Sequence, residues 1–137
     1  MKVEEAVELL KNNGYKYTGK RVEMLDFFAS HDRYLSAKDV FEGLKDRYPN
    51  LSFDTIYRNL ALFSELGILE STDLSGEKHF RITCMKNEHH HHFICLKCGR
   101  TREIEVCPMR QIAGELDGYQ ISGHKFEVYG YCNQCAG

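Results

Sequence analysis

Two Cys-x-x-Cys pairs limit what this chain can fold into more than any other feature of its sequence. The first pair is Cys95 and Cys98, and the second is Cys132 and Cys135. Four thiolates in two such turns suit one tetrahedral ion, with Zn–S distances of about 2.3 Å. Such a closed site has no open position, so it is structural rather than catalytic. A redox-active pair and disulfide bonds are the alternatives. The 33 residues between the pairs must form a substructure whose two ends meet.

The composition gives no indication of a membrane segment or a secretory signal. The chain has 137 residues and a formal net charge of -2, so any DNA-binding surface must be a local patch. The longest apolar runs are far too short to cross a bilayer, and no secretory signal precedes the first amphipathic pattern. We therefore expect a cytoplasmic protein without a membrane partner, in which six cysteines favour metal binding over disulfides.

The first 83 residues follow the order of a winged helix-turn-helix domain. Apolar residues at helical spacing predict helices over about 3–13, 19–30, 37–48 and 53–66. Thr18, Ser36 and Ser52 stand at the N-cap positions of the last three. Alternating runs at 68–72 and 78–82 flank a glycine-containing turn, which predicts a β-hairpin.

Residues 84–137 have a different sequence pattern, with short alternating runs and most of the cysteines and histidines, which predicts a second domain. We expect strands over 89–96 and 101–106, a helix over 109–116, and a strand or two within 118–128. The predicted fold class is α+β. A winged helix-turn-helix domain occupies residues 1–83, and a metal-binding α/β domain occupies residues 84–137.

Four consecutive histidines, His89 to His92, precede the first cysteine pair. Because side chains alternate along a strand, His89 and His91 face one way while His90 and His92 face the other. One run can therefore serve two metal sites, and a solvated polar tract is the alternative. Each face needs further ligands. The candidates are Cys84, Glu70, Asp73 and Glu103 on one side, and His124 with Glu105 or Cys107 on the other.

Cys84 is the candidate that bears most on the choice of metal. It can be a small buried residue rather than a ligand. If it is a ligand, its soft thiolate shifts the preference from iron or manganese toward zinc or copper(I).

Two features favour a nucleic-acid role. The outer face of the predicted helix over 53–66 is polar, as expected of a recognition helix in the major groove. Its residues are Thr55, Tyr57, Arg58 and Asn59. The segment 14–21 gathers Lys16, Lys20 and Arg21 with two tyrosines, which suits phosphates or a minor groove. An exposed polar helix face is more often only solvated, so neither pattern decides the matter alone.

Three segments together resemble the ferric uptake regulator (Fur) superfamily. They are residues 52–60 (SFDTIYRNL), 89–99 (HHHHFICLKCG) and 129–135 (YGYCNQC). The resemblance covers essentially the whole chain in order. It implies an N-terminal winged helix, a C-terminal α/β dimerisation domain, and a homodimer that binds double-stranded palindromic operator DNA when it is loaded with metal.

The resemblance also implies roles for single residues. It implies that the structural zinc site is formed by Cys95, Cys98, Cys132 and Cys135. The regulatory site at the domain hinge is matched by His90 and His92, with Cys84 before them. An additional site in the dimerisation domain is matched by His89, His91 and His124. The pair that contacts bases is matched by Tyr57 and Arg58, and the lysine that enters the minor groove by Lys16.

Two departures from the family pattern point toward zinc. Tyr34 stands where iron- and peroxide-sensing members carry a histidine, and Cys84 stands where they carry an acidic residue. A hinge thiolate resembles the zinc uptake regulators (Zur), whose hinge site uses one cysteine, two histidines and a carboxylate. We expect Glu70 to supply that carboxylate, with Asp73 and Glu103 as rivals.

The sequence therefore predicts a zinc-responsive transcriptional repressor of zinc-homeostasis genes. It would hold Zn²⁺ at both the structural and the regulatory site, with iron or manganese less favoured at the latter. The alternatives are an iron- or peroxide-sensing regulator and a zinc store or chaperone. We do not expect an enzyme, since the H-E-x-x-H pattern of zinc hydrolases is absent. The resemblance also implies a glutamate at the additional site. The stretch that would contain it, near Cys107 and Pro108, is shorter in this chain than in the family pattern.

Overall fold

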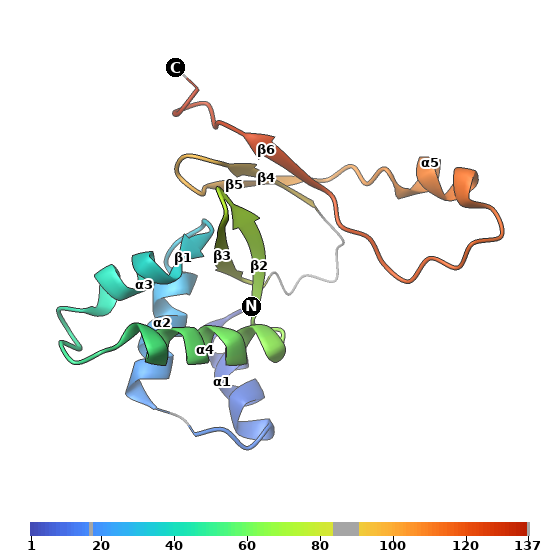
Figure 1. Ribbon diagram of the computed structural model, residues 1–137. Coiled ribbons are helices and arrows are strands. Elements are labelled where there is room, and N and C mark those ends of the chain that lie inside the picture. The colour runs from blue at the N-terminus through green and yellow to red at the C-terminus, as the bar shows by residue number, and fades with distance from the viewer. Residues whose placement is uncertain (17, 84–90, 137) are drawn as a thin grey trace. The chain divides into compact units, whose positions relative to one another are not determined.

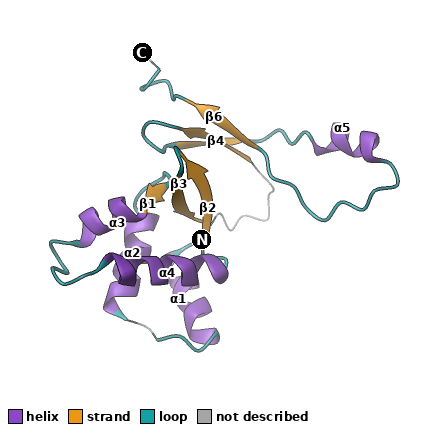
Figure 2. Ribbon diagram, in the orientation of Figure 1, coloured by secondary structure: helices purple, strands orange, loops and turns teal. Residues whose placement is uncertain are grey.

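The computed structural model describes residues 1–16, 18–83 and 91–136, and the chain divides into two compact units, Met1–Met85 and Lys86–Gly137 (Figure 1). The first unit is helical with a small sheet, and the second is built around another sheet (Figure 2). None of the described helices is long and apolar enough to cross a membrane. The expected α+β class is confirmed.

The first unit has the element order of a winged helix. The helices are α1 (Val3–Asn12), α2 (Gly19–Ala29), α3 (Ala37–Leu44) and α4 (Phe53–Glu65). The strands are β1 (Leu35–Ser36), β2 (Leu69–Leu74) and β3 (Glu77–Ile82), which form an antiparallel sheet in the order β1-β3-β2. The predicted hairpin is β2–β3. The two-residue β1 was not predicted, because so short a strand has no periodicity to recognise.

The apolar stripes of the four helices meet in one core. Its largest fully buried side chains are Leu10, Met24, Leu25, Phe28, Ile56, Leu60, Phe63 and Ile68. Their burial supplies the main stabilisation of this unit, at about 1.5–3 kcal/mol for each large apolar side chain. The core fixes α4 against α3 and leaves the other face of α4 in solvent.

The three predicted helix caps are present. The Thr18 hydroxyl accepts from the Arg21 backbone N–H at 3.3 Å, and the Ser52 hydroxyl accepts from that of Thr55 at 3.1 Å. Ser36 goes further and forms a reciprocal capping box with Asp39, with bonds of 3.1 and 2.9 Å. The third helix ends at Leu44 rather than near Tyr48, because the chain turns after it, although the Tyr48 side chain still packs on the core.

The second unit is a three-stranded sheet with β4 (His91–Cys95) at its centre. On one side β5 (Thr101–Ile104) pairs antiparallel with it, and on the other side β6 (Glu127–Gly130) pairs parallel. A parallel pair needs a crossover, which here carries α5 (Met109–Ala113) and a 3₁₀ turn, η1 (Gly114–Leu116). The predicted helix over 109–116 therefore has a 3₁₀ last turn.

The strands predicted within 118–128 are mostly absent. Residues 119–126 have no regular structure, and β6 begins only at Glu127. Gly118 has a φ of +85°, a left-handed conformation that interrupts an extended chain.

This second unit has very little apolar core of its own. Among its described residues only Ile94 and Cys95 are buried hydrophobic side chains. A unit of this size seldom folds stably on so small a core without cross-links, a metal or a partner chain. The residues that tie β4 to the end of the chain therefore matter most to its stability.

The capping box at the start of α3 gives a test of the first unit. Ser36→Ala removes the acceptor for the Asp39 backbone N–H, so we expect the free energy of unfolding to fall by about 1 kcal/mol. Lys38→Ala, at an exposed position of the same helix, should change it by less than about 0.5 kcal/mol. Urea unfolding followed by circular dichroism measures both. Equal stability of the two variants would contradict the capping assignment.

Candidate metal centres

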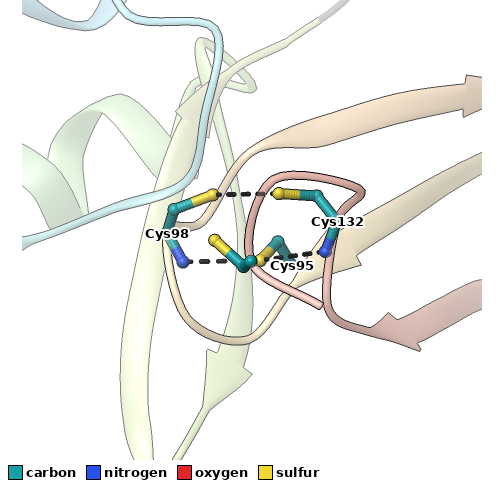
Figure 3. Close-up of side chains that lie close together, drawn as sticks. Cys95, Cys98 and Cys132 are labelled. Atoms are coloured by element: carbon teal, nitrogen blue, oxygen red, sulfur yellow. Dashed lines mark hydrogen bonds between the residues drawn. The ribbon is translucent and has the colours of Figure 1, made fainter. Parts of the chain in front are cut away.

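Four cysteines converge at one end of the second unit. Cys95 is the last residue of β4, Cys98 lies in the turn that leads to β5, and Cys132 and Cys135 follow β6. All four sulfur atoms lie within 4.8 Å of one another. In Figure 3 the sulfurs of Cys98 and Cys132 face each other, and the Cys95 sulfur lies beside them.

The distances fit a tetrahedral ion and do not fit disulfides. The Sγ atoms of Cys98 and Cys132 are 3.8 Å apart. Four sulfurs at about 2.3 Å from a tetrahedral centre are separated by about 3.8 Å, whereas a disulfide requires about 2.05 Å. The five described cysteines are all free thiols. The arrangement thus matches the donor set and the spacing of a thiolate zinc site.

The backbone turns of this cluster are shaped around the Cys95 sulfur. The backbone N–H groups of Cys98 and Cys132 donate to it at 3.5 and 3.4 Å. Gly99 closes the first turn by donating to the Cys95 carbonyl at 2.9 Å, with a φ of +74°, a conformation that favours glycine. The two ends of the 33-residue insertion are thereby brought together.

These contacts favour thiolate at Cys95. Burial raises the pKa of its thiol, but backbone hydrogen bonds from Cys98, Cys132 and Lys97 outweigh burial and lower the pKa from 9.0 to about 6. Hydrogen bonding to the Cys132 side chain, followed by burial, raises the pKa of Cys135 to about 12. Thiolates at this spacing repel one another, so full ionisation of the cluster requires a cation among them.

A second cluster lies on one face of the same sheet. His91 of β4, Cys107 in the loop after β5 and His124 in the loop before β6 place their ligand atoms within 4.8 Å of one another. His91 is only 5% exposed, and its ring contacts Phe126 edge-on at a centroid distance of 5.5 Å. The structure thus brings together two of the three residues expected at the additional site. His89, the third, lies outside the described residues.

Cys107 was expected only as a rival of Glu105 beside His124. The structure places Cys107 in the cluster, and Glu105 is not part of it. The sequence signal was weak, because a single cysteine after a strand has many possible roles. Its sulfur reaches His91 because the antiparallel pairing aligns Ile104, the last residue of β5, with His91.

His92 lies on the opposite face of β4, where the strand register supplies carboxylates. It is aligned with Glu103 of β5 and with Glu127 of β6, so the three side chains share one face. The remaining residues of the expected hinge site, Cys84 and His90, lie outside the described residues. That site therefore stays a prediction.

The three carboxylates proposed for the hinge site have different surroundings. Glu70 is aligned with Arg81 across β2 and β3, and its Oε1 lies 3.8 Å from the Arg81 Nε. Asp73 is exposed in the hairpin, opposite Lys78. Glu103 shares a face of the sheet with His92, so within the second unit it lies beside a predicted ligand.

Four of the six residues predicted to contact DNA line one hollow of the first unit, namely Lys16, Arg21, Thr55 and Asn59. This cavity of about 420 Å³ is lined by Gly14, Tyr15, Lys16, Thr18, Lys20, Arg21, Thr55 and Asn59. It joins the basic segment 14–21, which runs into the start of α2, to the first two turns of α4. Tyr57 is 55% exposed on α4, and the Arg58 Nε donates to the Asp54 carboxylate one turn earlier at 3.0 Å.

Arg21 connects the two sides of this hollow by hydrogen bonds. Its Nε donates to the Asn59 side chain at 2.9 Å, and its guanidinium also donates to the Lys16 carbonyl at 2.8 Å. Asn59 is only 8% exposed, and its amide donates to the Thr55 carbonyl at 3.0 Å. Asn59 was expected on the outer face of the helix, but its short side chain turns inward to Arg21. It is suited to position the basic loop rather than to read bases.

Comparison with known proteins decides the family. Residues 12–129 match the model of the "Ferric uptake regulator family". The chain belongs to the ferric uptake regulator family. The Fur family resemblance carried by the three sequence segments is thereby confirmed.

Within the Fur family, the chain is similar to regulators named for iron. It is 53% identical over 135 residues to the "Ferric uptake regulation protein" of Staphylococcus aureus strain N315, covering 98% of each chain. The relative of the same name from Staphylococcus epidermidis is 52% identical, with 98% of this chain and 96% of the relative covered. Among solved structures, the Francisella tularensis ferric uptake regulator with iron is 30% identical, with a TM-score of 0.69 and 89% and 95% of the two chains covered.

Removal of one cysteine of the four-thiol cluster should show what it holds. We expect wild-type protein dialysed against a mild chelator to keep one tightly bound zinc per chain. Cys132→Ser should lose that zinc, and the second unit should unfold at a lower temperature because its main cross-link is gone. Elemental analysis and thermal circular dichroism measure the two effects.

Cys107→Ser is the matched control, since it removes a thiol outside this cluster. It should keep the tightly bound zinc. If Cys132→Ser retained the same zinc content as wild type, the assignment of the cluster would be wrong.

Proposed function

We propose that this chain is an iron-responsive transcriptional regulator that binds operator DNA as a homodimer. The observation that carries the proposal is the 53% identity, over 98% of both chains, to a protein named Ferric uptake regulation protein. Zinc sensing, which we expected from Cys84, has weaker support. Cys84 lies outside the described residues, whereas the relatives named for iron match nearly the whole chain.

Operator DNA is the expected partner of the first unit. Lys16 and Arg21 line a hollow with residues of α4, which we take to be the recognition helix, and Tyr57 is largely exposed on α4. The helix can enter the major groove while Lys16 reaches phosphates or the minor groove. Since the formal net charge of the whole chain is only -2, this local surface must supply the electrostatic attraction to DNA. We expect such a regulator to bind DNA without catalysing a reaction. We also expect it to work in the cytoplasm, where operator DNA lies.

A second copy of the chain is the expected partner of the second unit. Nine of the twelve exposed large hydrophobic residues in the described part of the chain belong to this unit. They are Leu96, Val106, Ile112, Tyr119, Ile121, Phe126, Val128, Tyr129 and Tyr131. A unit with a small core and so many exposed apolar side chains favours association. A twofold dimer presents two recognition helices to the half-sites of a palindrome.

We assign different roles to the metals of the chain. The four cysteines hold a structural zinc, because their spacing suits a closed thiolate site and leaves no position for regulation. The sensing site is the predicted hinge site with His90, His92 and Cys84, and we include Glu103 as its carboxylate because the register aligns it with His92. Iron held by these residues would favour the conformation that binds DNA, and operator affinity would rise for that reason.

Metal-dependent DNA binding separates the iron proposal from the zinc alternative. We expect ferrous iron, added without oxygen to protein that retains its structural zinc, to raise operator affinity by about 5–150-fold, the range of a coupling free energy of about 1–3 kcal/mol. His92→Ala should abolish the response. Fluorescence anisotropy measures it, using a duplex selected from a random pool with metal-loaded protein. A response to zinc alone at buffered concentrations would contradict the iron proposal and favour a zinc regulator.

The salt dependence of binding tests the DNA surface. Lys16→Ala should weaken binding to the selected duplex and reduce the slope of log K against log salt by about 1, because one phosphate contact is lost. Lys2→Ala removes a charge from an exposed position outside the hollow and should leave the slope unchanged. Identical slopes for the two variants would remove Lys16 from the interface.

A further inference from the structure

We propose that Asp54 is a positioning residue for base recognition, which orients Arg58 so that its guanidinium reads a guanine. The inference rests on the proposed binding of DNA by α4, and it adds the residue that sets specificity at one base pair. Asp54 and Arg58 are four positions apart on α4, so they lie on the same face of the helix. Both side chains are exposed, and the exposed Tyr57 lies between them in the sequence.

The carboxylate of Asp54 occupies one edge of the Arg58 guanidinium. The Arg58 Nε donates to the Asp54 Oδ2 at 3.0 Å, and the Arg58 Nη2 donates to the same oxygen. A guanidinium presents its N–H donors in a rigid planar fork. These two bonds leave the edge formed by Nη1 and Nη2 for a ligand. Such an edge can donate to both the O6 and the N7 of guanine, the commonest specific contact of arginine in the major groove.

The backbone that carries Asp54 is held on both sides. The Ser52 hydroxyl accepts from the Thr55 backbone N–H at 3.1 Å, so the first turn of α4 is capped. The ring of Phe53 stacks on that of Phe41 in α3, with centroids 4.4 Å apart and planes at 18°. A carboxylate fixed in this way restricts the guanidinium before DNA arrives, which lowers the entropic cost of ordering it on a base.

Helix stability alone does not account for this pair. Exposed ion pairs at this spacing contribute little to stability, and a carboxylate beside the base-contacting residues repels the phosphates of DNA. That repulsion weakens binding to every sequence. The orientation of Arg58, in contrast, strengthens binding only where a guanine meets it. Asp54 thus increases discrimination between sequences while it lowers general affinity.

A base-pair scan of the selected duplex tests the assignment. Each position of the half-site is substituted in turn, and fluorescence anisotropy with metal-loaded protein gives the ratio of affinities for the original and the substituted duplex. The guanine read by Arg58 is the one at which Arg58→Ala loses the wild-type ratio, which we expect to be about 5–150-fold. At that base pair, Asp54→Ala should lower the ratio by at least about twofold, the smallest coupling typical of residues in contact.

The affinity for an unrelated duplex should change in the opposite direction. Asp54→Ala removes a negative charge, so its non-specific binding should be tighter than that of wild type. A variant with a damaged fold would instead lose affinity for both duplexes. Glu65→Ala is the matched control, because it removes an exposed acid from the other end of α4. It should leave the ratio at the guanine unchanged.

The double variant Asp54→Ala, Arg58→Ala shows whether Asp54 acts through Arg58. Its ratio at the guanine should equal that of Arg58→Ala, because no guanidinium is left to orient. A further loss would mean that Asp54 contacts a base itself, and an unchanged ratio in Asp54→Ala alone would mean that it orients nothing. Either result overturns the inference.

Failure of the inference can be told apart from failure of the proposed function. If Arg58→Ala matched wild type at every position, Arg58 would read no guanine and the inference would be wrong, while operator binding would stand. If wild type showed no sequence-specific binding at all, the proposed function itself would be contradicted.

Discussion

The second unit of this protein depends on the convergence of four thiols more than on apolar packing. Ile94 and Cys95 are its only buried hydrophobic side chains in the described part of the chain, and Cys95 is itself a member of the cluster. The thiols come from the end of β4, from the turn after it and from the segment after β6. An ion bound to all four would cross-link these segments beside the parallel pairing of β4 with β6, and would replace the core that a small unit lacks.

The central strand β4 separates two sets of candidate metal ligands. His91 faces Cys107 and His124, whereas His92 faces carboxylates on the neighbouring strands. Alternation along one strand thus places a sulfur-containing donor set on one face and an oxygen-containing set near the other.

Local patterns in the sequence predicted local structure well and missed what depends on tertiary contacts. Helical spacing and the caps at Thr18 and Ser52 located helices of the winged helix correctly, because capping needs only neighbouring residues. The inward turn of Asn59 toward Arg21 could not be foreseen, since it depends on a residue 38 positions away. Cys107 was one of several candidates until the return of the chain placed it beside His91. The preference for zinc over iron rested on Cys84 alone, and the relatives named for iron outweigh it.

The central claim is that the chain keeps a four-thiolate zinc apart from the metal that it senses. X-ray absorption at the zinc edge tests this most directly, on protein that retains one zinc per chain after mild chelation. We expect four sulfur neighbours at about 2.3 Å and no nitrogen or oxygen in the first shell. A shell containing nitrogen or oxygen would contradict the account, because it would mean that the most tightly held ion sits outside the four-cysteine cluster.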